Sequence, residues 1–394
     1  MSEFIYFPII KTRDAELRCF NHINEEDFSK ILPIYELTKS RKTKKAPDGD
    51  IYRRMKQIAD IQGNRPFILD LSTNEKYSNP QIEQLLSEHD GFKEWQYFLF
   101  DLHTELNVIP MVHLYEDDNG QFADVEEFVR TAATKTDFLA VRLPYDLSGE
   151  EVEYYLKPIV NNLGDSCKLY VLLDAEYVRN KVSSDVVDTF LDACSGINAF
   201  EGKIEDVIML CTSFPSNVAQ EGGEDIAGSF KICEEDIYQG ISEEFPIKYG
   251  DYASINTEQI EMKGGTFVPR IDIASLDGKS FTYKRYRRNN GGYVRCAIHT
   301  ISDKESYKPL GVWADDEITL AADENPSGIS PSFWISVRLP CPQKFVRQRR
   351  QGDPCPLCRT GALRAGTPPR RRDTRSPECR RAENLVSCEP DAAG

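Results

Sequence analysis

The sequence lacks the features that would immediately indicate a membrane protein, a secreted protein or a common enzyme class. No apolar run approaches the roughly 18 residues that cross a bilayer. The first residues, Met1-Ser2-Glu3-Phe4, carry an acid where a signal peptide has a basic segment. Walker, GxGxxG, HExxH and GxSxG motifs do not occur. We therefore expect a soluble, cytoplasmic protein that does not contact membranes, and no single motif defines a reaction.

The composition changes sharply near the C-terminal end. The chain has 394 residues, 40% hydrophobic and 28% charged, as in ordinary globular proteins. Residues 339–394 contain 12 Lys and Arg against 6 Asp and Glu, whereas residues 1–338 carry a net charge of −22. Five of the 11 Cys and eight of the 22 Pro also fall in this tail. We predict that residues 339–394 are disordered; a frameshift or a fusion is the simplest explanation, and an evolved functional tail is the alternative.

The cysteines do not form a metal-binding pattern. The tail contains one CxxC, at Cys355 and Cys358, but a zinc ribbon needs a second close pair, so we expect no metal there. The cysteines of the body are scattered and are expected to be buried reduced thiols: Cys19, Cys167, Cys194, Cys211, Cys233 and Cys296.

Hydrophobic periodicity in residues 1–263 predicts repeated βα units. Short apolar runs alternate with longer segments whose apolar residues recur at three and four positions, such as Ile51–Ile61. Eight such units match a TIM-barrel-like (β/α)8 domain. An open doubly wound sheet is the alternative, but its glycine-rich first turn is missing. The predicted strands are Phe7–Lys11, Ile31–Glu36, Phe67–Asp70, Val108–His113, Phe138–Arg142, Lys168–Asp174, Val207–Thr212 and Pro246–Asp251.

Residues 264–338 show a different pattern, which predicts a small β-rich appendage. Strand-like segments are separated by turn residues, and Asn290-Gly291 is a strong hairpin signal. The predicted strands are Thr266–Ile273, Ser280–Tyr286, Tyr293–Thr300 and Ser332–Val337.

Each predicted barrel strand ends in a polar residue. Because the C-terminal ends of parallel barrel strands meet at one mouth, where active sites of this fold lie, these residues predict a pocket. Polar loop residues also begin wherever strands end, so the pattern has a purely structural explanation as well. The candidate ligand-binding residues are Lys11, Glu36, Asp70, His113, Arg142, Asp174 and Asp251.

These residue types allow several chemistries. Lys11 and Arg142 suit a phosphate or carboxylate group. Glu36, Asp70 and Asp174 are natural ligands of Mg²⁺. Alternatively, the cations and carboxylates neutralise one another as buried ion pairs with no chemistry. His113 suits a general base, although a lone histidine at a strand end is more often structural.

A basic strip with interleaved aromatic residues spans residues 283–288. Arginines on phosphates and tyrosines under bases would suit single-stranded nucleic acid. The alternative is an exposed hairpin edge whose charges discourage strand pairing. The candidate nucleic-acid contacts are Tyr283, Arg285, Tyr286, Arg287 and Arg288.

Several short motifs resemble the phage and prophage beta protein family. They include the opening Pro8-Ile9-Ile10-Lys11-Thr12-Arg13, Pro33-Ile34-Tyr35-Glu36, Val141-Arg142-Leu143 and Gly311-Val312-Trp313-Ala314-Asp315. The resemblance covers roughly residues 4–338 and implies a barrel-type protein of phages and bacterial mobile elements, without a reaction or catalytic residues. The tail after residue 338 does not fit the family.

Two classes of function follow from these observations. The first is an enzyme or receptor that takes a small anionic ligand, such as a phosphate-bearing one, at the barrel mouth. The second is a non-enzymatic interaction protein of phage–host conflict that uses the barrel as a scaffold for a protein partner or contacts nucleic acid through the basic strip. The fold alone does not separate them.

Overall fold

The computed structural model describes residues 4–223, 225–253, 256–257 and 268–325. The strands that it contains are β1 (Tyr6–Lys11), β2 (Ile34–Leu37), β3 (Phe67–Leu71), β4 (Val108–Val112), β5 (Phe138–Pro144), β6 (Lys168–Tyr177), β7 (Ile204–Thr212), β8 (Ala227–Lys231), β9 (Lys248–Asp251), β10 (Arg270–Ala274) and β11 (Ser280–Arg285).

Helices follow most of these strands. They are α1 (Asp14–Phe20), α2 (Glu25–Phe28), α3 (Ile51–Gln62), α4 (Pro80–Leu85), α5 (His89–Tyr97), η1 (Phe98–Leu102), α6 (Ala123–Ala132), α7 (Gly149–Val160), α8 (Ser183–Ile197), η2 (Asn198–Lys203), α9 (Val218–Glu221), α10 (Glu234–Glu244), η3 (Arg288–Asn290), α11 (Gly292–Ser302) and α12 (Trp313–Ala322).

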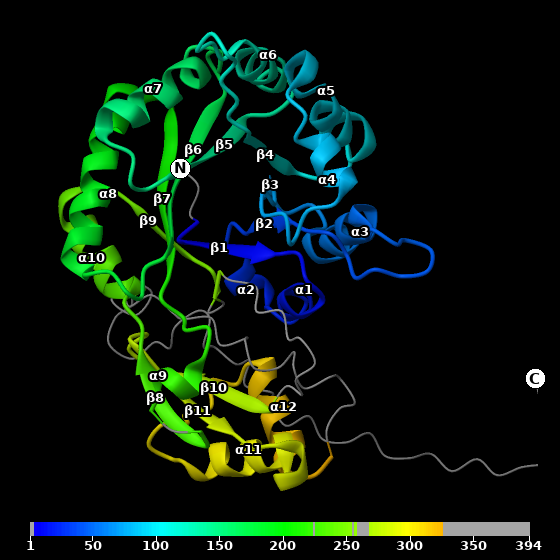
Figure 1. The fold of residues 1–394 in the computed structure, drawn as a ribbon, viewed down its shortest axis with the longest axis vertical. Coiled ribbons are helices and arrows are strands. Elements are labelled where there is room, and N and C mark those ends of the chain that lie inside the picture. Colours follow the sequence, from blue (N-terminus) through cyan, green and yellow to red (C-terminus); the bar gives the residue numbers. More distant parts are fainter. Residues whose placement is uncertain (1–3, 224, 254–255, 258–267, 326–394) are drawn as a thin grey trace, which may run out of the picture. The chain divides into compact units, whose positions relative to one another are not determined.

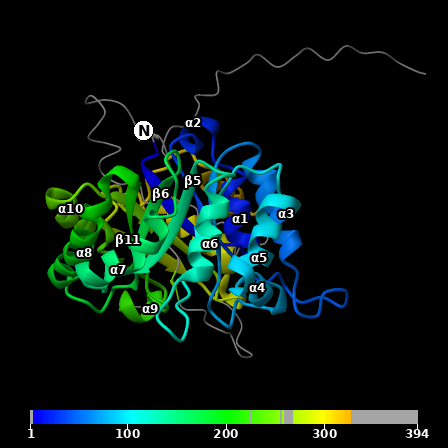
Figure 2. The same cartoon turned by 90° about the horizontal axis from the view of Figure 1, so that it is seen from above.

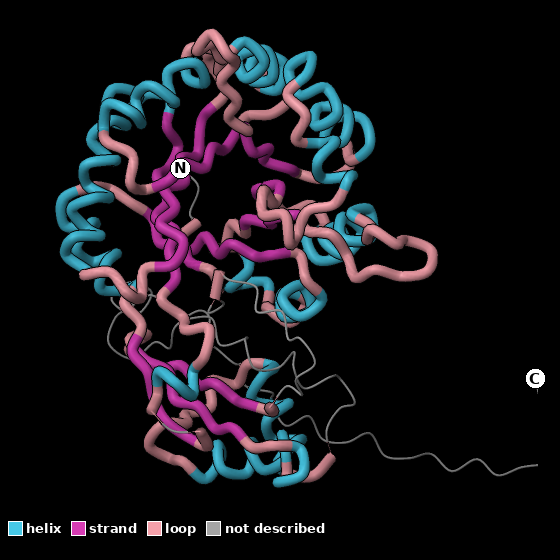
Figure 3. The backbone as a smooth tube through the Cα atoms, viewed as in Figure 1, coloured by secondary structure: helices cyan, strands magenta, loops and turns pink. Residues whose placement is uncertain are grey.

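The first seven strands and β9 close into a parallel barrel in the order β1-β2-β3-β4-β5-β6-β7-β9. The ring of strands is seen end-on in Figure 3, with helices around it. This confirms the predicted TIM-barrel-like fold, and each of the eight predicted barrel strands overlaps an observed one. The open doubly wound alternative is therefore wrong.

The helical layer forms because each helix has one apolar face. In α3, Ile51, Met55 and Ile58 are buried at helical spacing, and Asp50 caps the first turn by accepting a hydrogen bond from the Tyr52 N–H. In α7, Ser148 and Glu151 form a capping box. The helices surround the barrel strands in Figure 1, and Figure 2 shows the same arrangement after a 90° turn.

Side chains alternate between the inside of the barrel and the helical layer. On β1, Phe7 and Ile9 belong to an apolar cluster that fills the barrel, whereas Tyr6 and Ile10 pack in the larger cluster under the helices. This alternation is the period-two geometry of a strand. It also determines which strand-end residues face the inside of the barrel.

A separate antiparallel sheet has the order β10-β11-β8. Its strand β8 comes from the chain between β7 and β9, within the range predicted for the barrel, and pairs with β11. The helices α11 and α12 pack with this sheet through a cluster that includes Ile271, Cys296 and Ile318. The division of the chain at residue 264 stays a prediction.

The predicted strand over Tyr293–Thr300 is wrong, because these residues belong to helix α11. Asn290-Gly291 does not form a hairpin turn either. Gly291 adopts φ +87° at the N-terminus of α11, so the positive φ that glycine allows is used to start a helix. The predicted strand Ser332–Val337 and the tail 339–394 lie outside the described residues.

Candidate functional site at the barrel mouth

Five of the predicted site residues occupy inward positions at the C-terminal ends of their strands. Lys11, Glu36 and Asp70 stand side by side, because the strand register aligns Lys11 with Glu36 and Glu36 with Asp70. Arg142 follows Ala140 on the inward face of β5, and Asp174 follows Leu172 on the inward face of β6. The sequence alternation thus brings both cations and three carboxylates to one end of the barrel.

Arg142 connects the three carboxylates. Its Nε donates to Asp174 Oδ2 at 2.8 Å, and its Nη1 donates to Asp70 Oδ2 at 2.9 Å and to Glu36 Oε2 at 3.3 Å. Its Nη2 donates to the Tyr252 hydroxyl at 2.9 Å, and that hydroxyl donates to Asp174 Oδ2 at 2.6 Å. Only 21% of the Arg142 side chain is exposed. The guanidinium is therefore held in a fixed position by charged hydrogen bonds.

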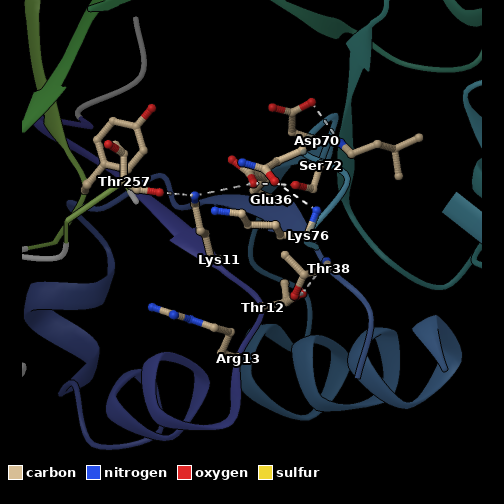
Figure 4. Close-up of polar contacts among 12 residues, drawn as sticks. Lys11, Thr12, Arg13, Glu36, Thr38, Asp70, Ser72, Lys76 and Thr257 are labelled. Atoms are coloured by element: carbon tan, nitrogen blue, oxygen red, sulfur yellow. Dashed lines mark hydrogen bonds and ion pairs between the residues drawn. The ribbon is translucent and has the colours of Figure 1, made fainter. Parts of the chain in front are cut away.

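The Lys11 ammonium donates fewer hydrogen bonds than the Arg142 guanidinium. Its ammonium donates to the Thr257 carbonyl oxygen at 3.1 Å and lies over the Tyr77 ring, with its Nζ 4.5 Å from the ring centroid. Glu36 Oε1 is 4.0 Å from Nζ, beyond hydrogen-bonding distance, and instead accepts a bond from the Ser72 hydroxyl at 2.8 Å. Figure 4 shows the contacts among Lys11, Thr257, Glu36 and Ser72. An ammonium has three donors, so Lys11 retains capacity to bind a ligand.

Two adjoining cavities open at this end of the barrel. The smaller, about 340 Å³, is lined by polar groups that include Lys11, Glu36 and Lys76. The larger, about 550 Å³, is lined by Asp70, Asp174 and a wall of apolar and aromatic side chains. Arg142 lines both cavities, as do Thr73 and Glu176. The residues predicted to converge therefore surround a real depression, although ligand binding there stays a prediction.

The charges in the cluster perturb one another's ionisation. Burial raises the pKa of Asp70 to about 6, although Arg142 opposes this shift. Burial also acts to raise the pKa of Glu36, but Arg142 and Lys11 outweigh it, so the pKa lies below its usual value. Burial lowers the pKa of Lys11. Three carboxylates face two cations in this cluster, and the excess negative charge is removed only when Asp70 takes up a proton, as the pH falls to about 6 and below.

His113 lines the larger cavity, but its environment does not suit the role of a general base. Burial against Trp95 and Phe92 lowers its pKa to about 4, so the imidazole is neutral near pH 7 and a weak proton acceptor. Its Nε2 is buried and has no hydrogen-bond partner within the described part of the chain.

Asp251 does not join the Arg142 cluster. It accepts hydrogen bonds from the Tyr6 hydroxyl at 2.6 Å and the Tyr249 hydroxyl at 3.0 Å. Both tyrosines belong to the apolar layer between strands and helices. Asp251 therefore faces outward from the barrel and lines neither of the two cavities at the mouth.

Three residues stand out among those at the mouth that sequence reasoning missed. Tyr252 takes the inward position after β9 and completes the Arg142 network. Lys76, in the loop after β3, extends toward Lys11 and Glu36 in Figure 4. Glu176 adopts φ +49° at an irregularity of β6, a strained conformation for a residue other than glycine. Only Tyr252 had a sequence signal, which is its position one residue after a predicted strand.

The carboxylates are not arranged as a metal site. Arg142 occupies the position between Glu36, Asp70 and Asp174. Over the described ranges, no three acidic, histidine or cysteine side chains are grouped closely enough to hold an ion. The geometry thus gives the Mg²⁺ hypothesis no support in that part of the protein.

The basic strip at 283–288 is mostly engaged in the fold. The Tyr283 side chain has 0% exposure, and Tyr286 is also buried, so neither ring is accessible to stack on a base. Arg285 is half-buried and pairs with Asp225. Arg287 and Arg288 are exposed. Nucleic-acid binding by this strip stays a prediction, and the burial of its aromatic residues weighs against it.

The chain matches the Beta protein family over residues 6–340. It belongs to the beta protein family. This confirms the resemblance read from the short motifs. The match covers every residue of the Arg142 cluster and ends where the basic, cysteine-rich tail begins.

A curated relative and a solved structure extend this comparison. The chain is 28% identical to Protein beta of Enterobacteria phage P4 over 342 residues, which cover 85% of this chain and 91% of that protein. The spore cortex-lytic enzyme SleL of Bacillus megaterium QM B1551 is 10% identical, with 82% of this chain and 74% of that chain covered. Its TM-score of 0.31 is too low to support an argument. Among the residues that the structure describes, no helix has the length and apolar character of a membrane span.

Proposed function

We propose that this beta family protein binds a small molecule carrying a phosphate or carboxylate group in the smaller cavity of the barrel mouth. The observation behind this proposal is that Lys11 and Lys76 line one polar cavity and that neither ammonium is fully engaged by the protein. Lys76 is exposed and forms no ion pair with any described residue. Two ammonium groups at one cavity favour an anionic occupant.

Arg142 has a supporting role in this proposal. Its donors already bind Glu36, Asp70, Asp174 and Tyr252, so it has little capacity left for a ligand. It fixes the carboxylates so that Glu36 stays near Lys11. The lysines then supply the positive charge that a ligand meets.

Polar uncharged groups complete the cavity. Ser72, Thr73, Asn74 and Thr257 contribute hydroxyl, amide and backbone groups to its lining. Such groups orient an oxyanion through hydrogen bonds without adding charge. The volume of about 340 Å³ lies within the range of small-molecule sites, which begins near 300 Å³.

A thermal-shift screen with phosphate-bearing and carboxylate-bearing metabolites tests the proposal. A ligand at 100 times its Kd adds about 2.7 kcal/mol of stability and raises the Tm measurably. We expect Lys76→Ala to remove most of the shift because it deletes a ligand contact without touching the Arg142 network. Lys157→Ala, at an exposed lysine of α7, is the matched control and should retain the full shift.

The competing function is an interaction protein that uses the barrel as a scaffold. It predicts that no anionic metabolite raises the Tm and that Lys76→Ala behaves like Lys157→Ala. Either result would contradict binding in the smaller cavity.

A further inference from the structure

The two cavities of the barrel mouth differ in chemistry. The smaller one is polar and carries the two lysines. The larger one has apolar and aromatic walls formed by Leu86, Phe92, Leu114, Tyr115 and Tyr145. Because Thr73, Arg142 and Glu176 line both, the polar and apolar sites meet at a shared boundary.

The charges decide which part of a ligand each cavity can take. The larger cavity contains four carboxyl side chains, from Asp70, Asp146, Asp174 and Glu176, against Arg142 and Lys181. Lys181 is partly engaged, because its Nζ donates to the Tyr145 hydroxyl at 2.6 Å and lies 4.5 Å from the centroid of that ring. An anionic group is therefore disfavoured in the larger cavity, where an uncharged apolar or aromatic group can contact the walls.

We infer that the two cavities form one bipartite site for a ligand with a phosphate or carboxylate at one end and an uncharged flat apolar or aromatic group at the other. This inference rests on the proposed function, because it places the anionic end beside Lys11 and Lys76. Arg142 and Thr73 lie at the boundary, where the two parts of the ligand join. The volumes of about 340 and 550 Å³ each suit one part of such a molecule.

Tyr115 offers a specific test of the apolar half. It lines the larger cavity, and with 38% of its surface exposed it can be replaced without opening the core. Its matched control is Tyr97, a tyrosine of α5 that is 52% exposed and lines neither cavity. The variants Tyr115→Ser and Tyr97→Ser remove the same chemical group at the two positions.

Titration calorimetry with paired probes measures the two halves separately. The probes are phenyl phosphate against inorganic phosphate, and benzoate against acetate. We expect the aromatic member of at least one pair to bind about tenfold more tightly, because burying a ring removes apolar surface from water. Tyr115→Ser should remove most of this gain and leave the Kd of the small anion unchanged, whereas Tyr97→Ser should change neither.

The results separate failure of this inference from failure of the proposed function. If small anions bind through Lys76 but the aromatic probes bind no more tightly, the bipartite site is wrong and the anion site remains. A gain that persists in Tyr115→Ser would also overturn the bipartite site. If Lys76→Ala binds both small anions as the wild type does, the anion site itself is wrong.

Discussion

Asp70 and Asp251 both stand at the end of a barrel strand, with 4% and 3% of their surface exposed, and burial raises the pKa of both to about 6. Their surroundings differ completely. Asp70 faces the barrel mouth, binds Arg142 and lines the larger cavity. Asp251 faces the helical layer, where the hydroxyls of Tyr6 and Tyr249 bind it.

This difference shows that a polar residue at a strand end is not enough to predict a site. The face of the strand on which the residue lies decides whether it meets the other strand ends or the helices. Asp251 satisfies its carboxylate through neutral hydroxyl donors and the Ala253 N–H, which is typical of a structural group. Asp70 shares a guanidinium with two other carboxylates beside a cavity, an arrangement that often occurs at functional sites.

Among the variants that compare the two sites, replacement of Arg142 should cause the largest loss of stability. Arg142→Met leaves Glu36, Asp70 and Asp174 buried without their shared counter-charge, and breaking such a network costs about 3 to 5 kcal/mol. Asp251→Asn keeps one acceptor oxygen for the Tyr6 hydroxyl, and its amide NH2 can donate to the Tyr249 hydroxyl once that hydroxyl rotates, so the change should cost about 1 kcal/mol or less at neutral pH. Denaturant unfolding measures both changes. Equal losses in the two variants would mean that the Arg142 cluster is no more important to stability than the Asp251 site.

The pH dependence of stability should be similar at the two aspartates. A folded pKa of about 6 lies above the ordinary value of 3.8, so between these pH values the folded state holds a proton that the unfolded state has released. Stability therefore falls as pH rises through this window, by up to roughly 3 kcal/mol for each group. When the free energy of unfolding is measured from pH 4 to 7, Asp70→Asn and Asp251→Asn should each show a smaller fall with rising pH than the wild type.

Ligand binding should separate the same two variants. Asp70→Asn removes a negative charge beside Arg142, so we expect small anions to bind a few times more tightly, about two- to fivefold. Asp251→Asn should leave their Kd unchanged, because Asp251 lines neither cavity. An equal change in both variants would show that the orientation of the strand face does not determine which carboxylates influence anion binding.

The sequence predicts the barrel and much of its mouth, because both depend on period-two alternation. Phe7, Ile9 and Lys11 fall on one face of β1, and that pattern is present in the residues themselves. At β9 the alternation separates Asp251 from Tyr252, the residue after the strand. Tyr249 and Tyr252 place an aromatic residue on each face, so the pattern does not show which face is inward.

The other errors of the sequence-based prediction have two sources. Some residues lie where no hydrophobic periodicity applies, and at one segment a turn motif conflicts with the helical spacing. Lys76 and Glu176 reach the mouth through a loop and a strand irregularity, whose conformations depend on tertiary contacts. In α11, the buried residues Cys296, Ala297 and Thr300 have helical spacing. The hairpin signal at Asn290-Gly291 favours a strand after it, although Gly291 uses its positive φ to begin a helix.

Removal of residues 341–394 should have the smallest effect on the Tm. It should also leave unchanged the difference in stability loss between variants at the Arg142 cluster and at Asp251. The family match ends at residue 340, and the tail has too few apolar residues to offset roughly 1–2 kcal/mol of backbone entropy for each ordered residue. We therefore expect the Tm of the truncated chain to stay within about 2 °C of the full chain. The stability losses caused by Arg142→Met and Asp251→Asn should also be the same in both chains. A large fall in Tm would mean that residues 341–394 stabilise the body. The tail is basic and the body has a net charge of −22. Repeating the measurement at high salt would therefore show whether charge attraction is the cause.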